Sequence, residues 1–313
     1  LMLAGNRLAA LPDNLQHASA LELLRIAANR FARLPDWLTT LPRLSWLAWA
    51  GNPLTAQLEA AALAQASARG IPAAALTLGD RLGEGASGVI RAATLRHGDS
   101  NGNDSADEAV AVKQFKGTVT SDGWPGSEMA ACLAAGAHDA LVPVRGPVLN
   151  TGADPQAAHA LVLGRLPPGT QALAAPPSFD SCTRDVYDDA LQLSPADVLA
   201  WARQVAGAMA QLHARGLVHG DLYAHNLLRA GQRLWLSDLG AASFLPPDQA
   251  GLHARLRALD GRAYGVLLGE WLARCTAPQA PELSALRAWR DASQASDTAA
   301  PFDFAKLHDS LAF

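Results

Sequence analysis

Residues 219–226 read His-Gly-Asp-Leu-Tyr-Ala-His-Asn, and Asp-Leu-Gly follows at residues 238–240. This stretch places Asp221, then Asn226 five positions later, and then Asp238 seventeen positions after the first aspartate, just beyond an apolar run. Phosphoryl transfer needs such a set. One carboxylate must orient the attacking hydroxyl and accept its proton, while an amide and a second carboxylate hold Mg²⁺ on the phosphates. The spacing therefore predicts a phosphoryl-transfer site in this part of the chain.

The same spacing resembles the H-R-D-L-x-x-x-N and D-F-G motifs of the protein kinase family. The resemblance implies that Asp221 is the catalytic carboxylate and that Asn226 and Asp238 bind Mg²⁺. Tyr223 stands where many kinases have a lysine that contacts the γ-phosphate. The resemblance further implies a catalytic role for His225, which would partly replace that lysine as an arginine does in tyrosine kinases.

Three features of this stretch depart from the family pattern. Gly220 replaces the usual arginine, which in the family pairs with a phosphorylated activation loop. The loop from Asp238 to about Leu259 has Ser243 as its single hydroxyl, so we expect no switching by loop phosphorylation. No A-P-E motif follows, and Asp260 in the next helical run is expected to anchor the catalytic loop.

The chain upstream of this stretch has the features of a nucleotide-binding lobe. Glycines between two strand-like runs resemble the glycine-rich hairpin of kinases, in which backbone N–H groups approach phosphate oxygens. The run Ala-Val-Ala-Val-Lys at residues 109–113 resembles the V-A-I-K motif, whose lysine steadies the α- and β-phosphates. Lysine occurs at only three positions against 22 arginines, which adds weight to a lysine here. The nucleotide-binding residues implied by these matches are Gly83, Gly85, Gly88, Val89, Ala111 and Lys113.

Two further parts of the nucleotide site follow from the order of the elements. Glu128 is the single acid of the short helical run 127–136, and the resemblance implies that it holds Lys113. Residues 164–166 correspond by order to the hinge between two lobes, where backbone groups hydrogen-bond adenine. The residues expected around adenine are Gly164, Leu166, Leu227 and Leu228. The expected cofactors are ATP and Mg²⁺.

Residues 1–54 repeat with a period of 23, at which Asn6, Asn29 and Asn52 recur within a leucine template. The pattern resembles leucine-rich repeats, in which leucines pack inside a solenoid and the asparagine amide bonds backbone at the turn. An amphipathic helix would need apolar spacing of three to four residues instead. Two and a half coils do not bury a stable core alone, so we expect the tail of a longer array. Its exposed concave face would suit a protein partner.

The composition bounds the class of protein. The 313 residues are half apolar and carry a formal charge of −4, which gives no electrostatic case for nucleic acid binding. The apolar runs are too short to span a membrane. The three cysteines are odd in number and far apart, which argues against a disulfide framework or a zinc site. The expected compartment is the cytoplasm.

Together these features resemble a bacterial-type cytoplasmic protein kinase with leucine-rich repeats. The expected fold is an α/β repeat solenoid fragment followed by an α+β two-lobed kinase-like fold with a reduced C-lobe. The predicted boundaries are residues 1–72 for the repeats with a capping helix and 75–313 for the kinase-like domain, divided into N-lobe 75–163, hinge 164–166 and C-lobe 167–313.

We expect this protein to transfer the ATP γ-phosphate to protein Ser or Thr hydroxyls, with the repeats selecting the protein partner. Two alternatives stay open. The His-Gly-Asp stretch without A-P-E also resembles small-molecule kinases of the aminoglycoside and choline type. The chain could instead be a catalytically silent scaffold that binds through its repeats.

Overall fold

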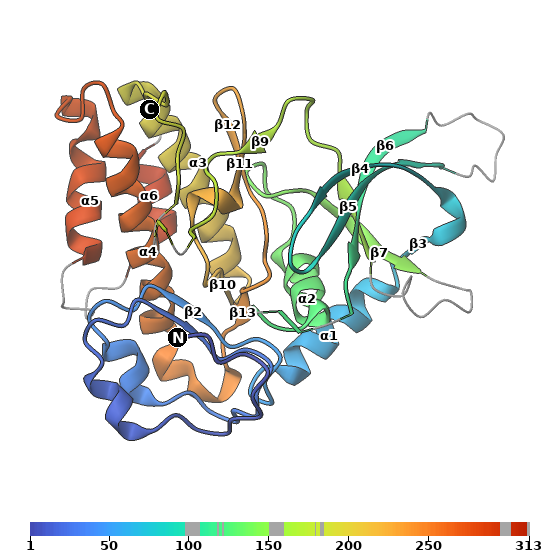
Figure 1. Ribbon diagram of the computed structural model, residues 1–313, viewed down its shortest axis with the longest axis horizontal. Coiled ribbons are helices and arrows are strands. Elements are labelled where there is room, and N and C mark those ends of the chain that lie inside the picture. The colour runs from blue at the N-terminus through green and yellow to red at the C-terminus, as the bar shows by residue number, and fades with distance from the viewer. Residues whose placement is uncertain are drawn as a thin grey trace.

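The structure is a computed structural model that describes residues 1–97, 107–117, 119–120, 122–149, 160–178, 180–181, 185–294 and 302–311. A sheet-rich lobe and a helical lobe lie side by side, and an N-terminal segment, residues 1–55, lies against the helical lobe (Figure 1). No helix of these residues is both long and apolar enough to cross a membrane.

The sheet-rich lobe, or N-lobe, is built on six strands in the order β3-β7-β8-β6-β5-β4. They are β3 (Ile71–Pro72), β4 (Leu76–Glu84), β5 (Gly88–Leu95), β6 (Glu108–Phe115), β7 (Val144–Leu149) and β8 (Ala160–Gly164). Strand β6 shows how the sequence forms this sheet, because successive side chains of a strand point to opposite faces. Val110 and Val112 pack into the lobe's core, whereas Ala111 and Lys113 line the cleft between the lobes.

Two helices pack beside the N-lobe sheet. Helix α2 (Pro125–Ala135) has proline in its first turn, where no hydrogen-bonded N–H is lost, and it ends before Gly136, whose φ is +73°. Helix α1 (Ala56–Ser67) runs along α2 and β7 (Figure 1). The predicted capping helix is therefore present, but it packs along the N-lobe.

The helical lobe, or C-lobe, is organised around α3 (Pro195–Ala214) and α4 (His253–Ala273). Helix α3 begins with a capping box, in which Ser194 Oγ accepts the Asp197 N–H and the Asp197 carboxylate accepts the Ser194 N–H. One apolar face of α3 is buried: Val198, Trp201, Val205, Ala208 and Leu212. Helix α4 begins earlier than expected, so the loop after Asp238 ends before His253 and not near Leu259.

Shorter elements complete the C-lobe. They are β9 (Gln171–Ala172), β10 (Leu217–Val218), β11 (Leu227–Ala230), β12 (Arg233–Leu236), β13 (Ser243–Phe244), α5 (Ser284–Gln294), α6 (Phe304–Ser310) and the 3₁₀ segments η5 (Ala224–Asn226), η6 (Pro247–Leu252) and η7 (Pro281–Leu283). Strands β12, β11 and β9 form one small sheet, and β10 pairs with β13. The last helix docks through Leu307 and Leu311, both buried.

The N-terminal segment repeats its backbone geometry every 23 residues. Strands β1 (Leu23–Arg25) and β2 (Trp46–Ala48) are parallel, and each residue of β1 pairs with the residue 23 positions later. Asn29 accepts the backbone N–H of Asn6 at 3.0 Å, and Asn52 bonds the preceding coil in the same way. The period found in the sequence thus corresponds to a regular stacking of coils.

The N-terminal segment shares a hydrophobic core with the C-lobe. Leu47 and Trp49 belong to the same buried cluster as Val218, Leu256 and Leu259. Through this cluster the C-lobe supplies apolar surface against which the coils of the N-terminal segment pack. Residues 71–72 also form an edge strand of the N-lobe sheet, so the predicted division at residue 72 cuts through that sheet.

The strand face of the N-terminal segment is covered, contrary to the expectation of an exposed concave surface. Arg25, Trp46 and Ala48 are only 2%, 1% and 0% exposed. The prediction was wrong for these residues because the catalytic loop and the loop after Asp238 pack on them.

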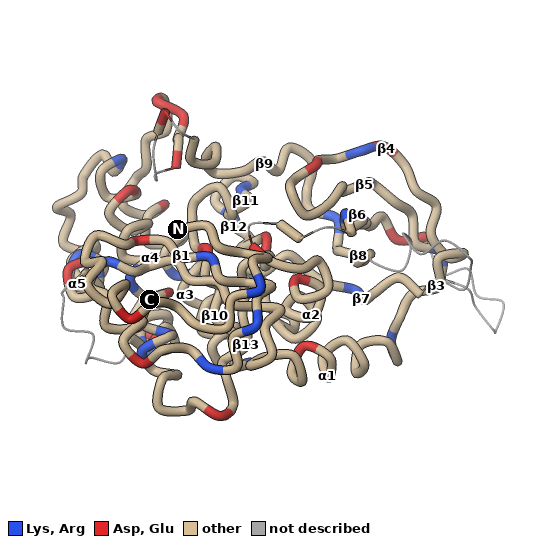
Figure 2. Tube along the Cα trace, turned by 60° about the horizontal axis from the view of Figure 1, so that its bottom comes forward, with Lys and Arg blue, Asp and Glu red and all other residues tan. Residues whose placement is uncertain are grey.

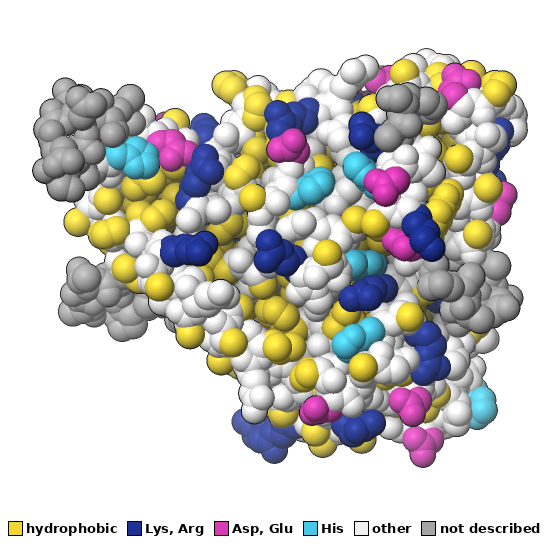
Figure 3. Space-filling model, turned by 180° about the vertical axis from the view of Figure 1, so that it is seen from behind, with side chains coloured by type: hydrophobic (Ala, Val, Ile, Leu, Met, Phe, Trp, Pro, Cys, Tyr) yellow, Lys and Arg dark blue, Asp and Glu magenta, His cyan; other side chains and the backbone are white. Residues whose placement is uncertain are grey.

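Charged residues of both signs are interspersed through the lobes and the N-terminal segment (Figure 2). On the face seen in Figure 3, basic, acidic and histidine side chains alternate with hydrophobic ones. The described surface in these views therefore mixes both signs, in keeping with the small formal charge of −4.

Candidate active site

The catalytic loop lies between β10 and β11, and one buried carboxylate fixes its backbone. Asp260 of α4 accepts the N–H of His219 at 2.9 Å and of Gly220 at 3.0 Å, and it bonds His213 Nε2 at 2.9 Å. Burial alone would raise the pKa of Asp260, but the bonds to His213 and Gly220 outweigh it and hold this pKa below its usual value. Asp260 thus lies where the resemblance placed it, as the anchor of the loop.

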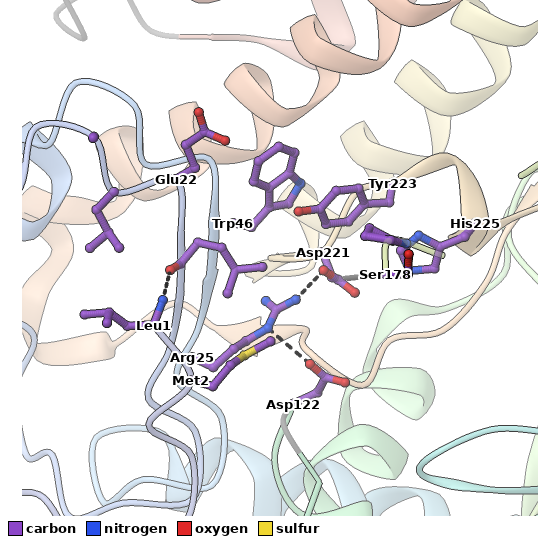
Figure 4. Close-up of a pocket in the computed structure, with 14 residues that line it drawn as sticks. Leu1, Met2, Glu22, Arg25, Trp46, Asp122, Ser178, Asp221, Tyr223 and His225 are labelled. Atoms are coloured by element: carbon purple, nitrogen blue, oxygen red, sulfur yellow. Dashed lines mark hydrogen bonds and ion pairs between the residues drawn. The ribbon is translucent and has the colours of Figure 1, made fainter. Parts of the chain in front are cut away.

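Asp221 has protein donors on both carboxylate oxygens. Asn226 Nδ2 donates to Oδ2 at 3.0 Å, and Arg25 Nη2 from strand β1 donates to Oδ1. Figure 4 shows Arg25 between Asp221 and Asp122, whose carboxylate lies 3.1 Å from Arg25 Nε. Burial alone would raise the pKa of Asp221, but Arg25, followed by His225, outweighs burial and lowers it. The predicted proton acceptor is therefore an ionised carboxylate beside a cation that the kinase lobes do not supply.

Lys113 and Glu128 form a buried ion pair between β6 and α2. Burial alone would lower the pKa of Lys113, but Glu128 outweighs it and raises this pKa, so the ammonium group stays charged. Because Glu128 is 2% exposed and lies in the first turn of α2, the pair also fixes this helix against the sheet. The structure brings together the two residues that the sequence paired.

Two neighbouring cavities lie in the cleft between the lobes. One, of about 240 Å³, is lined by Lys113, Glu128, His225, Asn226 and Asp238 among others. The second, of about 410 Å³, lies between Gly83, Ala111 and the hinge residues Gly164 and Leu166. Both are bounded by Ile90, Val142, Leu163 and Leu228. The first holds the charged and amide side chains that phosphates could meet, and the second lies against the hinge, where a flat base could bind.

Two predicted nucleotide contacts point elsewhere because strand side chains alternate. Val89 pairs with Gln114, whereas Ile90 pairs with Lys113 and lines both cavities, so the apolar contact after the glycines is Ile90. Similarly, Leu228 lines the cavities as predicted, but its neighbour Leu227 is 0% exposed in the C-lobe core. Which of the two neighbours faces the cleft depends on the register between β5 and β6, which the sequence alone does not give.

The glycine-rich hairpin joins β4 to β5 and lies over the cleft. A Cβ at Gly83 or Gly85 would meet nothing within 4 Å, while one at Gly88 would lie 2.6 Å from the Gln114 carbonyl oxygen. Gly88 is thus required by the close approach of β6, and Gly83 and Gly85 leave open space. The Gly85 N–H donates to the Gly88 carbonyl at 2.9 Å, so in this conformation it closes the hairpin and does not face a phosphate.

The predicted hinge lies at the end of β8. Gly164 and Leu166 both line the larger cavity, as expected. The Gly164 N–H donates to the Pro143 carbonyl at 2.8 Å, however, so an adenine ring must use another group of the hinge backbone. Strand β8 ends at Gly164, so Leu166, two residues later, has its backbone outside the hydrogen-bonded sheet.

Asn226 and Asp238 have the donor chemistry of a Mg²⁺ site. Asp238 is exposed to the cleft at a φ of +47°, a conformation that non-glycine residues rarely adopt and that often marks functional positions. The Asn226 Nδ2 group donates to the Asp221 carbonyl at 2.9 Å, which turns the amide oxygen away from Asp221. The described residues contain no group of three or more His, Cys, Asp or Glu placed to hold a metal. Two protein oxygens therefore fit Mg²⁺ only together with phosphate and water oxygens, as this ion prefers.

His225 lies where the two sides of the site meet. Its Nδ1 bonds Asp185 at 2.6 Å, and its ring stacks on Tyr223 with centroids 5.2 Å apart. Burial alone would lower the pKa of His225, but the bond to Asp185 outweighs burial and raises it. The raised pKa favours the charged form of an imidazole that lines the cavity of Lys113 and Asp238, where the predicted replacement of the family's lysine would act.

Four residues of the site were missed by the sequence interpretation. Arg25, Trp46 and Asp122 surround the catalytic loop, and Asp185 holds both His225 and the Ala224 N–H. Arg25 contacts Asp221 across 196 positions of sequence, and Asp185 contacts His225 across 40. Neither spacing belongs to a local motif, so no pattern along the chain could have found them.

The cleft has the ammonium group of Lys113 on one side and the oxygens of Asn226 and Asp238 on the other, which suits a polyphosphate bound with a cation. This architecture defines a two-lobed, nucleotide-dependent phosphotransferase. A model of the protein tyrosine and serine/threonine kinase family matches residues 76–257, more than half of the chain, and the chain belongs to that family. The match starts with strand β4 and ends within α4, so the N-terminal segment lies outside it.

Curated relatives match over a much shorter stretch. Proteins of Methanosarcina mazei and Methanosarcina acetivorans, each named probable bifunctional tRNA threonylcarbamoyladenosine biosynthesis protein, are 49% identical over 43 residues. A protein of the same name from Methanosarcina barkeri is 43% identical over 54 residues. These matches cover 14% to 17% of this chain and only 8% to 9% of the relatives' length. The similarity is therefore local.

Proposed function

We propose that this chain transfers the γ-phosphate of ATP to serine or threonine hydroxyls of a protein. The observation that carries the proposal is the convergence of Lys113, Glu128, Asn226 and Asp238 on one cavity of about 240 Å³. In this scheme Lys113, fixed by Glu128, holds the α- and β-phosphate oxygens. A bound Mg²⁺, held by Asn226 and Asp238, would neutralise charge on the phosphates.

Asp221 serves the acceptor side of the proposed reaction. Its carboxylate orients the acceptor hydroxyl and takes its proton as the hydroxyl oxygen bonds the γ-phosphorus. The bond from that phosphorus to the bridging oxygen breaks, and ADP leaves.

We also propose that the N-terminal segment is the end of a leucine-rich repeat array that contributes to acceptor choice. The 23-residue pairing of β1 with β2 supports the repeat identity. A cavity of about 780 Å³ lies between this segment and the catalytic loop, with Leu21, Glu22 and Trp46 in its wall beside Asp221 (Figure 4). An acceptor that reaches Asp221 through this cavity contacts the repeats. We further propose that the protein is a bacterial-type kinase and that it acts in the cytoplasm, where ATP is available.

The test is transfer of label from γ-labelled ATP with Mg²⁺ to a panel of acceptors. The panel contains serine, threonine and tyrosine peptides, mixed protein, an aminoglycoside and choline. We expect label on serine or threonine, abolished in Asp221→Asn and Asp238→Asn and retained in the control Glu282→Gln, which changes an exposed acid of η7. Label only on the aminoglycoside or choline would assign a small-molecule kinase instead. Nucleotide binding with no transfer to any acceptor would assign a silent scaffold.

A further inference from the structure

Arg25 is a buried arginine from outside the two kinase lobes that reaches the catalytic loop (Figure 4). Its side chain is 3% exposed. Nη1 donates to the Gly220 carbonyl at 2.8 Å, Nη2 donates to Asp221, and Nε lies 3.1 Å from Asp122. One guanidinium therefore joins strand β1, the segment before α2 and the catalytic loop.

The contact is a constant part of the fold. Trp49 Nε1 donates to the Phe244 carbonyl at 3.0 Å, and the Gln249 side chain both donates to and accepts from the backbone of Leu34. Arg262 donates to two carbonyls of the N-terminal segment. These bonds surround the hydrophobic cluster that the segment shares with the C-lobe. Because Arg25 is part of a segment that shares this core, we assign it to the working site and not to a separable inhibitor.

The catalytic loop is shaped for this neighbour. A Cβ at Gly220 would lie 2.4 Å from the Leu47 carbonyl oxygen, closer than Cβ atoms approach in proteins, and the φ of +71° also favours glycine. The position at which the family has an arginine therefore has no room for a side chain. Nearby, Tyr223 stacks on Trp46 with centroids 4.4 Å apart, so the N-terminal segment also covers the position of the family's lysine.

Asp221 can still receive an acceptor hydroxyl while Arg25 is bound. An ionised carboxylate offers about four acceptor positions on its two oxygens. Arg25 and Asn226 use one on each oxygen. The two bonds hold the plane of the carboxylate from opposite ends and leave acceptor capacity for a third donor.

We propose that Arg25 is a positioning residue for phosphoryl transfer. It holds the Asp221 carboxylate in the orientation that receives the acceptor hydroxyl, and it ties the loop before α2 to the catalytic loop. This inference rests on the proposed function, since it gives the transfer step its orienting group. Arg25 acts through Asp221 and does not line the nucleotide cavities, so its loss should slow transfer without weakening nucleotide binding.

The experiment compares Arg25→Gln and Arg25→Lys in the full chain with the parent protein. Misplacement of a catalytic group by about 1 Å can cost about 100-fold in rate. We expect kcat of Arg25→Gln to fall on the order of 100-fold with KM for MgATP within about twofold. The kcat of Arg25→Lys should be about tenfold higher than that of Arg25→Gln but still below that of the parent, because one ammonium group replaces only part of a guanidinium. The matched control is Gln249→Leu, which removes buried docking bonds far along the same interface.

A second readout separates orientation from activity. In ¹H–¹⁵N spectra the side-chain amide of Asn226 reports its bond to Asp221 Oδ2, and it should shift in Arg25→Gln but not in Gln249→Leu. Unchanged or higher kcat in Arg25→Gln, or an equal loss of kcat in Gln249→Leu, would overturn the inference. If the parent protein transfers no phosphate at all, the proposed function fails, and an unshifted Asn226 amide would then refute the orienting role of Arg25 as well.

Discussion

Asp260 illustrates how a single buried side chain holds an active-site loop. It is 1% exposed and accepts three hydrogen bonds, two of them from the backbone of His219 and Gly220. Replacing the carboxylate with an amide turns an acceptor into a donor that faces N–H groups. We therefore expect Asp260→Asn to lower the free energy of unfolding by roughly 3 kcal/mol at pH 7.

The effect of Asp260→Asn should depend on pH in a defined direction. The pKa of Asp260 is lower in the folded protein than its usual value. Its stabilisation is therefore complete above the unfolded-state pKa of about 4 and is lost as pH falls through the folded-state pKa. Urea unfolding at pH 7, 5, 4 and 3 should show the two proteins converging at low pH. A difference that stays constant down to pH 3 would contradict this account.

Ile90 and Val89 provide a matched pair of neighbouring residues on opposite faces of β5. Ile90 lines both cavities of the cleft, and Val89 does not. Truncation to alanine removes apolar contact with the base only at Ile90, at a cost of about 1–2 kcal/mol. Steady-state kinetics should show KM for ATP about tenfold higher in Ile90→Ala and within about twofold of the parent in Val89→Ala. The opposite order would place the nucleotide elsewhere.

The residues found from the sequence were those with local spacing. Asp221, Asn226 and Asp238 lie within eighteen positions on one loop and its hairpin, so their convergence depends on a single local structure. Arg25 and Asp122 come from other elements, and only the packing of the whole chain brings them to the loop. The error at Val89 has a different cause, since the face that a strand residue takes depends on the register between β5 and β6.

Helix α1 controls the placement of α2 through one buried carboxylate. Glu59 of α1 accepts the Thr55 hydroxyl at 2.7 Å, the Gly51 N–H at 2.9 Å and the Ser127 hydroxyl at 2.7 Å. Ser127 precedes Glu128, the partner of Lys113. The N-terminal segment and the nucleotide site are therefore connected through two consecutive residues of α2.

We predict that Ser127→Ala lowers catalytic efficiency strongly, because it frees α2, but lowers the stability of the fold only slightly. The substitution removes a single hydrogen bond, worth about 1 kcal/mol, but releases the turn that aims Glu128. We expect kcat/KM to fall about tenfold with a small change in the thermal midpoint. Thr55→Val is the control, because it removes another bond to Glu59 without touching α2. Equal kinetic losses in both variants would argue against this connection.

The elements themselves were largely predictable, whereas their docking was not. Helix α3 follows from its capping box and apolar face, and the parallel coils follow from the period of 23. The N-terminal segment packs on the C-lobe through Leu47 and Trp49, whose pattern is equally compatible with packing on further coils. Periodicity indicates which face is buried but not what covers it.

At the scale of the whole molecule, the N-terminal segment and the C-lobe form one cooperative unit. Removal of residues 1–55 would expose the cluster of Val218, Leu245, Leu252, Leu256 and Leu259. We expect the remaining chain to lose its sharp thermal transition and to bind a hydrophobic dye. Calorimetry on the truncated and full chains checks this. A truncated protein that unfolds cooperatively near the parent midpoint would show that the segment is a separable domain.

The central claim is that Lys113 and Asp238 act on the phosphates of one metal-bound nucleotide. Titration calorimetry of ATP, with and without Mg²⁺, tests it on the parent protein, Lys113→Met and Asp238→Asn. The account predicts that Mg²⁺ strengthens ATP binding to the parent at least tenfold, that Asp238→Asn removes this gain, and that Lys113→Met weakens binding with or without the metal. Binding of ATP that is unaffected by Mg²⁺ and by both substitutions would contradict it.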